Sequence, residues 1–353
     1  MLTKKRYSIK DMVLWTRGET LIYLLYAGVI TLLYKVFGFT FLNVPWTPVA
    51  LIGTAVAFLV GFQNNSAYGR IWEARMIWGA IVNTSRTLGM KVQDMVTNEY
   101  CKDPVSEDEL KQHKKILIYR HIAWMTALRY AMRQRKSWET QHHAKTNREW
   151  RDMIHIPEEV SSLEDNLMMY LSEDEKSYVL SKGNKQTAIL YLQSKHFRRL
   201  KEQGIIWEFS FLELENVLES LFTHQGKSER IKNFPYPRQY ASLVLYLTRV
   251  FTILLPFGLI PEFAEIGKTT VDNFYLVSEY FIWIAVPFCA IVSWAFHTME
   301  RLARTGENPF EGGPNDVPIS TIARGIEIDL RQMLDEDSND IPCQFPEEQN
   351  VQM

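Results

Sequence analysis

The sequence predicts an all-α polytopic membrane protein, in which four transmembrane helices are combined with a helical cytosolic domain. Four strongly apolar stretches, two near each end of the 353-residue chain, indicate the membrane helices. Between them lies a long polar region with apolar residues at helical spacing and no alternating strand pattern. The mean hydropathy of −0.16 averages over these two kinds of sequence and hides the membrane segments.

Each apolar stretch is close to the length that crosses a bilayer. The four predicted spans are residues 21–37, 47–62, 240–260 and 274–296. The first has 17 residues, and the mixed polar sequence before it argues against a signal peptide. The second has 16 residues and no charge, which is typical of a helix that continues into a shielded interior.

The distribution of basic residues predicts the orientation. The tail before the first span carries Lys4, Lys5, Arg6, Lys10 and Arg17, whereas the loop after that span has almost no basic residues. Because basic residues favour the cytoplasmic side, both termini and the middle region are expected in the cytoplasm, with the protein in the inner (plasma) membrane. The predicted organisation is a cytoplasmic segment (1–20), a transmembrane hairpin (21–63), a helical cytosolic domain (64–238), a second hairpin (239–297) and a cytoplasmic C-terminal segment (298–353).

The middle region carries local signals for helices. Ser106 with Glu109, and Ser172 with Glu175, have the spacing of capping boxes ahead of apolar residues. Apolar residues at helical spacing predict longer helices, which are expected over residues 110–132, 187–200 and 206–222. Two polar blocks are predicted as loops, namely 136–152 and 226–238.

Composition and motifs argue against an enzyme or a nucleic-acid-binding protein. A net charge of −2 provides no basic excess for nucleic acid. The three cysteines lie far apart, and there is no phosphate-binding glycine loop, HExxH motif or nucleophile elbow. His142 and His143 are adjacent without partner ligands, which is more typical of a plain surface than of a metal site. We therefore expect no catalytic residue, no metal and no cofactor.

The second span contains two stripes with a period of four residues. Gly53, Ala57 and Gly61 form a stripe of small residues that permits close helix packing. On an adjacent face, the second stripe consists of Thr54, Phe58 and Phe62. There are two interpretations. The span packs tightly within its own bundle and buries the phenyl rings of Phe58 and Phe62, or identical helices from several copies surround a narrow, mostly apolar tube.

The sequence around this span resembles the bestrophin family, and its bacterial branch most closely. The resemblance is carried in order by residues 61–86 (GFQNNSAYGRIWEARMIWGAIVNTSR), 228–237 (SERIKNFPYP), 247–257 (LTRVFTILLPF) and 307–333 (ENPFEGGPNDVPISTIARGIEIDLRQM). It implies a homopentameric channel of mainly helical protomers in the lipid bilayer, which passes small inorganic ions through one pore on the fivefold axis.

The resemblance also assigns residues to two constrictions of the pore. Thr54, Phe58 and Phe62 match the neck, a hydrophobic constriction in the membrane. Phe209, with Leu212 as the alternative, matches the cytosolic aperture. A narrow apolar neck acts as a gate by losing water, since an ion must shed hydration at large cost to enter it.

Other polar positions near the pore have two interpretations each. Asn64 and Asn65 either bind ions below the neck or cap neighbouring backbone. Arg249, inside the third span, is expected to pair within the bundle rather than to line the pore. Eukaryotic members of the family carry a run of acidic residues after the NPF motif that helps to form a calcium clasp. In this sequence the only acidic residues directly after that motif are Glu311 and Asp316, so calcium activation is not expected.

Family membership leaves the sign of the conducted ion open, because eukaryotic members conduct anions and a bacterial relative is understood to pass cations. The electropositive ring edges of Phe58 and Phe62 favour chloride. The acidic loop between the last two spans favours cations, although its charges are screened within roughly 8 Å. The expectation is a weak preference for anions, with a sodium- or potassium-conducting channel as the alternative and a non-conducting membrane scaffold as a third hypothesis.

Overall fold

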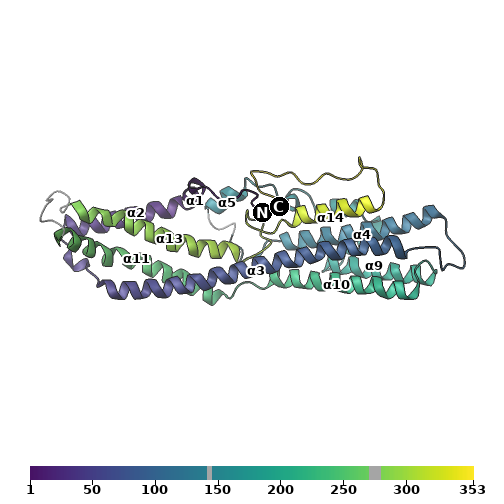
Figure 1. The fold of residues 1–353 in the computed structure, drawn as a ribbon, viewed down its shortest axis with the longest axis horizontal. Coiled ribbons are helices and arrows are strands. Elements are labelled where there is room, and N and C mark those ends of the chain that lie inside the picture. The colour runs from purple at the N-terminus through teal and green to yellow at the C-terminus, as the bar shows by residue number, and fades with distance from the viewer. Residues whose placement is uncertain (141–144, 270–279) are drawn as a thin grey trace.

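The structure is a computed structural model that describes residues 1–140, 145–269 and 280–353. These residues form helices joined by loops, and their only β-type pairing consists of two isolated bridges that involve Val351. The molecule is long and narrow, with its main helices running along its length (Figure 1). The all-α prediction is therefore confirmed for the part of the chain that the structure describes.

The helix α3 (Trp46–Met95) runs through both ends of the molecule and joins them (Figure 1). One end, here named the bundle, contains α1 (Ile9–Trp15), α2 (Arg17–Lys35), η1 (Thr40–Leu42), α11 (Arg238–Thr269), η2 (Ile282–Ile284) and α13 (Ala285–Gly306). The other end, here named the body, contains α4 (Glu107–Arg133), α5 (Lys145–Arg151), α6 (Pro157–Val160), α7 (Leu163–Met168), α8 (Glu173–Leu180), α9 (Lys185–Glu202), α10 (Glu208–Asn233) and α14 (Ile319–Met333).

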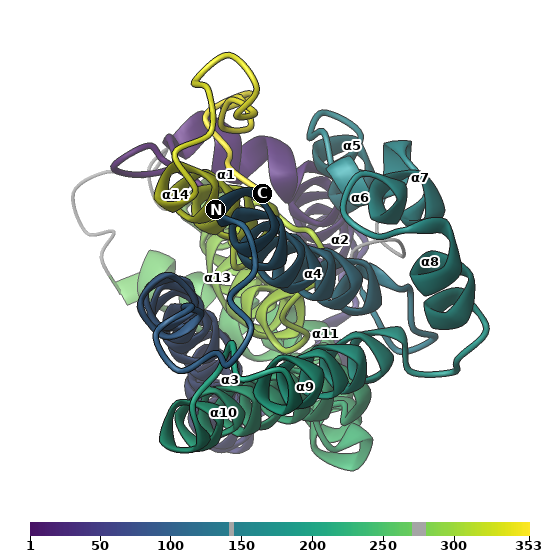
Figure 2. The ribbon, with the colours of Figure 1, turned by 90° about the vertical axis from the view of Figure 1, so that its right-hand side faces the viewer.

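The 50 residues of α3 form one unbroken helix. At a rise of 1.5 Å per residue it is about 75 Å long. It packs against α11 and α13 in the bundle and against α10 and α14 in the body, and Figure 2 shows α3 and α10 side by side at one edge. The predicted boundary at residue 63 falls inside this helix, so no linker separates the bundle from the body at that point.

The two ends have separate apolar cores. The body core is the larger and includes the fully buried side chains of Trp78, Leu88, Trp124 and Phe197. The bundle is held by two smaller clusters, one around Phe251 and the other around Ile260. In the body core, each fully buried side chain of this size stabilises the fold by about 2 kcal/mol relative to exposure to water.

The predicted helix starts in the body are confirmed. The Ser106 hydroxyl accepts a hydrogen bond from the Glu109 backbone N–H at 3.2 Å, and Ser172 accepts one from Glu175 at 3.4 Å. These bonds satisfy backbone donors that the first turn of a helix leaves free. The amphipathic run at 187–200 lies in α9, and the run at 206–222 lies in α10 except for its first two residues.

The loop predicted over 226–238 is wrong for most of its length, because α10 continues to Asn233. Ser228 and Ile231 are buried on the inner face of this last part of the helix. The buried ammonium of Lys232 forms an ion pair with the buried carboxylate of Glu139. Burial lowers the pKa of Lys232, and the Glu139 carboxylate opposes that shift. The block at 136–152 likewise contains the short helix α5.

Three helices are long and apolar enough to cross a membrane among the described residues, namely η1 with α3, α11, and η2 with α13. They contain the second and third predicted spans and residues 282–296 of the fourth. Residues 274–279 of the fourth span lie outside the described residues. The first predicted span lies in α2, which is not one of the three; its 19 residues include Arg17, Glu19 and Lys35. The four-span topology therefore stays a prediction.

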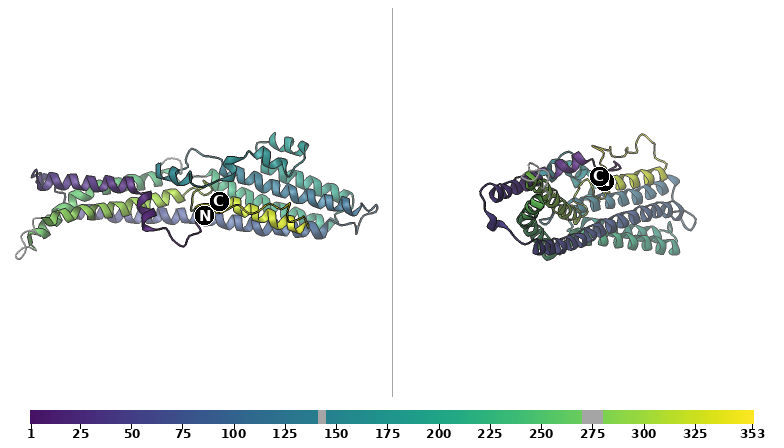
Figure 3. Two further views of the ribbon diagram at one scale, coloured as in Figure 1. Left: turned by 90° about the horizontal axis from the view of Figure 1, so that it is seen from above. Right: turned by 60° about the vertical axis from the view of Figure 1, so that its left-hand side comes forward.

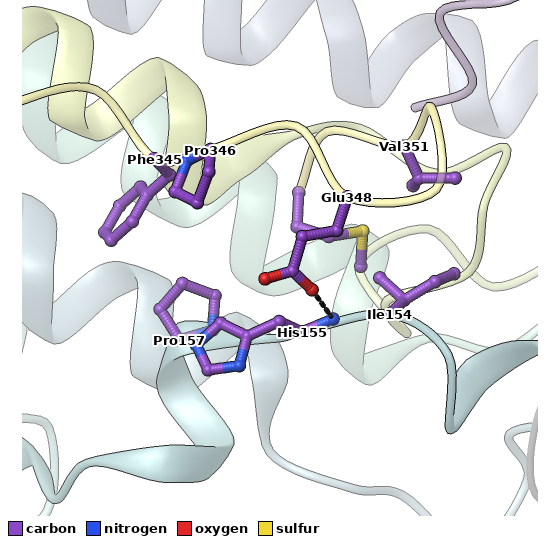
Figure 4. A pocket seen from close by; sticks show the side chains of 8 residues that line it. Ile154, His155, Pro157, Phe345, Pro346, Glu348 and Val351 are labelled. Carbon is purple, nitrogen blue, oxygen red and sulfur yellow. Dashed lines mark hydrogen bonds between the residues drawn. The ribbon is translucent and has the colours of Figure 1, made fainter.

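The first and last residues of the chain lie together on the body. Leu2 pairs with Val351 in an isolated antiparallel bridge, and the Thr3 N–H donates to the Asn350 carbonyl at 2.9 Å. The C-terminal tail also lies against residues 154–157, where the Glu348 carboxylate accepts a hydrogen bond from the His155 N–H at 3.2 Å (Figure 4). This arrangement places both termini at the same level of the molecule (Figure 3).

Two buried histidines make the body sensitive to acid. Burial lowers the pKa of His121 from 6.5 to about 3, and burial together with the Arg120 guanidinium does the same for His196. Their contribution to stability is complete above the unfolded pKa and is lost as the pH falls from about 6.5 towards 3. We expect the free energy of unfolding to drop by about 1.4 kcal/mol per pH unit per histidine in this window.

The measurement is chemical unfolding of the purified protein at a series of pH values. His121→Phe, which keeps an aromatic ring but takes up no proton, is expected to reduce the acid slope. The exposed His155 provides the control as His155→Phe, which is expected to leave the slope unchanged. Equal slopes in His121→Phe and the unmodified protein would contradict the prediction.

Candidate functional site

The predicted neck residues lie on a face of α3 that the described chain leaves uncovered. Thr54 is exposed, and the side chains of Phe58 and Phe62 are 66% and 56% exposed. The two rings are perpendicular, with their centroids 4.5 Å apart, so the edge of one meets the face of the other. The Thr54 hydroxyl donates to the Ala50 carbonyl at 2.9 Å, which engages its proton within the helix. The result is an apolar aromatic patch at the surface of a single chain.

The uncovered face continues along α3 beyond the predicted neck. Tyr68, Trp72 and Met76 are all more than half exposed, and the rings of Tyr68 and Trp72 stack with centroids 6.2 Å apart. These three residues are spaced four apart, which keeps them on one side of the helix, and that side also carries Thr54 and Phe58. Sequence analysis did not single them out as a surface, although the helical spacing of large apolar residues carried that signal.

The stripe of small residues divides between two surfaces. A methyl group at Gly53 would lie 2.6 Å from Cε2 of Phe251, so this glycine permits the close approach of α11. Ala57 and Gly61 are exposed, and a methyl group at Gly61 would meet nothing within 4 Å. Gly53 therefore belongs to packing within the chain, whereas Ala57 and Gly61 belong to the uncovered face.

The two asparagines after the predicted neck differ in their contacts. The Asn64 amide donates to the carbonyls of Val60 at 2.9 Å and Met299 at 3.0 Å, which ties α3 to α13. Asn65 is exposed, and its side chain makes no hydrogen bond within the described part of the chain. In the single chain Asn64 therefore hydrogen-bonds to neighbouring backbone carbonyls, whereas the amide of Asn65 is free to bind a ligand.

The predicted aperture residues form a second uncovered apolar patch at the far end of the body. Phe209 is 62% exposed in the first turn of α10, and Leu212 is exposed one turn later. The Trp207 ring packs against Phe209 with centroids 4.7 Å apart and stacks on Tyr100. These supporting aromatic residues were not found from the sequence.

The neck and aperture residues are held far apart by α3. The backbone N–H of Thr97, just after α3, donates to the carbonyl of Ile205 at 3.1 Å, and Lys91 pairs with Glu213 at 2.6 Å. These contacts fix the start of α10 beside the end of α3. From Phe62 to the end of α3 the helix runs roughly 50 Å.

The loop after α13 uses the two acidic side chains that follow its NPF motif internally. The Asp316 carboxylate accepts hydrogen bonds from the backbone N–H groups of Phe310, Gly312 and Val317 at 2.7–2.8 Å, and pairs with Arg133 at 3.1 Å. Glu311 accepts a hydrogen bond from the Thr140 N–H. Among the described residues no group of three or more His, Cys, Asp or Glu side chains is placed to hold a metal ion.

Two other expectations concern single side chains. Arg249 is exposed, and it has no ion pair in the parts of the chain that are described, so the expected pairing inside the bundle is not seen. In the bundle the guanidinium that is buried and paired belongs to Arg301, which contacts Glu19 at 3.2 Å. His142 and His143 lie outside the described residues.

The packing at Gly53 generates a prediction about stability. Gly53→Val is expected to lower the free energy of unfolding by about 1–3 kcal/mol, because its side chain overlaps the Phe251 ring and separates α3 from α11. Gly61→Val is the matched control, because the same side chain meets open space in the protomer. Thermal unfolding of the detergent-solubilised protein measures both; equal melting temperatures for the two variants would contradict the packing argument.

Comparison with known proteins adds independent information on this chain. A family model described as "Bacterial/Fungal Bestrophin protein" matches residues 8–332. The voltage-dependent anion channel-forming protein YneE of Escherichia coli K12 is 26% identical over 318 residues, which cover 89% of this chain and 85% of the relative. The Salmonella typhi protein of the same name is 26% identical over 308 residues, covering 86% and 82%. A crystal structure of a bacterial bestrophin homolog from Klebsiella pneumoniae has the same fold, with a TM-score of 0.70 and 20% identity over 91% of this chain and 99% of that one.

Proposed function

The chain belongs to the bacterial and fungal bestrophin family, and from this premise we propose that it is a pentameric channel for small inorganic ions with a weak preference for anions such as chloride. The observation that carries the proposal is the uncovered aromatic stripe of Phe58 and Phe62 on α3. No catalytic residue, metal or cofactor takes part in this function.

Burial in the protomer favours assembly around α3. Of the most apolar 18-residue stretch of η1 with α3, only 22% is buried within the protomer, compared with 44% of the corresponding stretch in α11 and 33% in η2 with α13. Lipid alone does not account for this exposure, because the apolar face continues through Tyr68, Trp72 and Met76 towards the body. A ring of copies covers the flanks of such a face and leaves its centre to line a tube. The number of five copies is taken from the family.

Thr54, Phe58 and Phe62 form the neck of the proposed pore. A narrow ring of phenyl groups opposes ion entry because the ion must shed its hydration, so the neck gates by wetting and drying. Phenyl rings at Phe58 and Phe62 that lie edge-on to the bore present electropositive edges, which favour an anion. The names of the relatives, anion channel-forming proteins, support the same sign. Cation conduction is the alternative.

Phe209, with Leu212, forms the proposed cytosolic aperture. Both side chains are apolar and uncovered in the protomer, and the ion pair of Lys91 with Glu213 fixes them to the end of α3. In a ring of copies the pore therefore has two constrictions, one formed by α3 and the other by the start of α10 beside the end of α3. Asn65, whose amide is free, is proposed to contact ions between them, and Asn64 to support the wall.

The proposed topology has four spans, both termini in the cytoplasm and the inner membrane as the location. The pairing of Leu2 with Val351 supports a common side for the two termini. The proposed regions are a cytoplasmic segment (1–20), the first hairpin (21–63), the cytosolic domain (64–238), the second hairpin (239–297) and a cytoplasmic end (298–353).

The experiment that tests the function records purified protein in a planar bilayer under a potassium chloride gradient, with calcium chelated. We expect the reversal potential of the current to be shifted from zero towards the chloride equilibrium potential. Reversal near the potassium equilibrium potential would replace the anion proposal by the cation alternative. Silence from a folded, oligomeric preparation would favour a non-conducting scaffold.

A second experiment tests the neck. Phe58→Ala and Phe62→Ala are each expected to raise single-channel conductance or open probability several-fold, because the wider bore stays wet. Phe288→Ala, at a half-exposed position on α13, is the control and is expected to leave currents unchanged. Unchanged conductance and gating in both neck variants would show that these residues do not form the constriction.

A further inference from the structure

The short helix α1 presents an apolar face that nothing in the described chain covers. The Ile9 side chain is 85% exposed, and Val13 and Leu14 are also exposed. These residues lie on neighbouring sides of the helix, whereas Trp15 turns towards the bundle. In the left view of Figure 3, α1 lies across the long axis of the molecule, at the junction between the bundle and the body.

Basic side chains lie on α1 and on the segment just before it, and Asp11 is the acidic residue of α1. Lys4, Lys5, Arg6 and Lys10 are all exposed, and none of them forms an ion pair within the described ranges. They stand in a chain whose net charge is −2, so this local excess of positive charge is not a property of the whole protein. Unpaired cations beside an apolar strip are the pattern of helices that lie on anionic membranes.

The end of α1 is fixed rigidly to the bundle. The buried Arg301 guanidinium donates to the Trp15 carbonyl at 3.0 Å and lies 4.4 Å from the centroid of the Trp15 ring. The Trp294 indole N–H donates to the Thr16 hydroxyl at 2.8 Å. The junction of α1 with α2 therefore holds a set position, and the exposed face of α1 continues into the exposed apolar residues Leu21 and Ile22.

We propose that α1 and the basic segment before it form an interfacial anchor that binds anionic phospholipid headgroups of the cytoplasmic leaflet. The apolar face enters the boundary between headgroups and acyl chains, while Lys4, Lys5, Arg6 and Lys10 contact the phosphates. Lipid fits this surface better than a second copy of the chain because the apolar face is continuous with α2, which enters the membrane next. This inference rests on the topology proposed above.

The test measures the environment of a spin label at Val13→Cys in the full chain, with Cys101→Ser and Cys343→Ser and the buried Cys289 left in place. The protein is placed in nanodiscs of phosphatidylcholine alone or with an equal amount of phosphatidylglycerol. Collision rates with oxygen, which dissolves in lipid, and with a water-soluble nickel chelate report immersion. A label at the exposed Asp103→Cys gives the reference for water.

We expect the Val13 label to favour oxygen in the phosphatidylglycerol discs and to move towards water at high salt. Replacing the cluster by Lys4→Gln, Lys5→Gln, Arg6→Gln and Lys10→Gln reduces immersion, at roughly fivefold in partitioning per basic side chain. A matched variant with the same charge change in the body is expected to keep the Val13 label immersed. Its substitutions are Lys102→Gln, Lys111→Gln, Lys182→Gln and Lys195→Gln.

Three results would overturn the inference. A label that meets water in both lipids shows that α1 is not at the membrane. Equal immersion in both lipids, unaffected by the charge variant, shows that headgroup charge is not recognised. A label shielded from both reagents shows that a neighbouring copy covers α1. A channel that stays silent while the label meets lipid refutes the proposed conduction and leaves the anchor standing.

Discussion

Contact between α3 and two different sets of partners, α11 and α13 in the bundle and α10 and α14 in the body, joins the two ends of the molecule. In the bundle, Gly53 receives the Phe251 ring of α11, and in the body Gly89 receives Leu330 and Met333 of α14. At both places a single methyl group would collide with a neighbouring side chain, so the close approach depends on the missing side chain. Because both contacts lie on one continuous helix, the register of the bundle and that of the body are not independent.

The loop that follows α13 makes a second connection between the bundle and the body. Phe310 adopts a φ of +75°, a conformation that costs a non-glycine residue about 1–2 kcal/mol. The hydrogen bonds to Asp316 hold this backbone, and the buried Phe310 ring lies against Trp78 of α3. The same carboxylate pairs with Arg133 of α4. The chain thus leaves the bundle and enters the body through a loop that is fixed by internal charges.

The fold class could be predicted because its signals are local. Apolar length marks α3 and α11, and a serine three residues before a glutamate marks the starts of α4 and α8. The continuation of α10 to Asn233 could not be predicted, because its polar residues are typical of a loop. The helix buries Lys232 against Glu139, a residue far away in the sequence that pairs with it. That Phe58 and Phe62 share one face follows from their four-residue spacing, whereas the spacing left open whether that face is buried. That Asn64 bonds to the Met299 carbonyl depends on the position of α13. The four-residue spacing of Tyr68 and Trp72 places them on one face of α3, but that this face is uncovered became clear only from the packing of the other faces.

The unbroken length of α3 has a mechanical consequence. A helix about 75 Å long acts as a lever, so a tilt of roughly 3° about one end displaces the other by about 4 Å. Rotation about the helix axis turns the faces of Phe58 and Met76 through the same angle. Any force applied to the body is therefore transmitted to the level of Phe58 as displacement or torque, with no joint in between to absorb it.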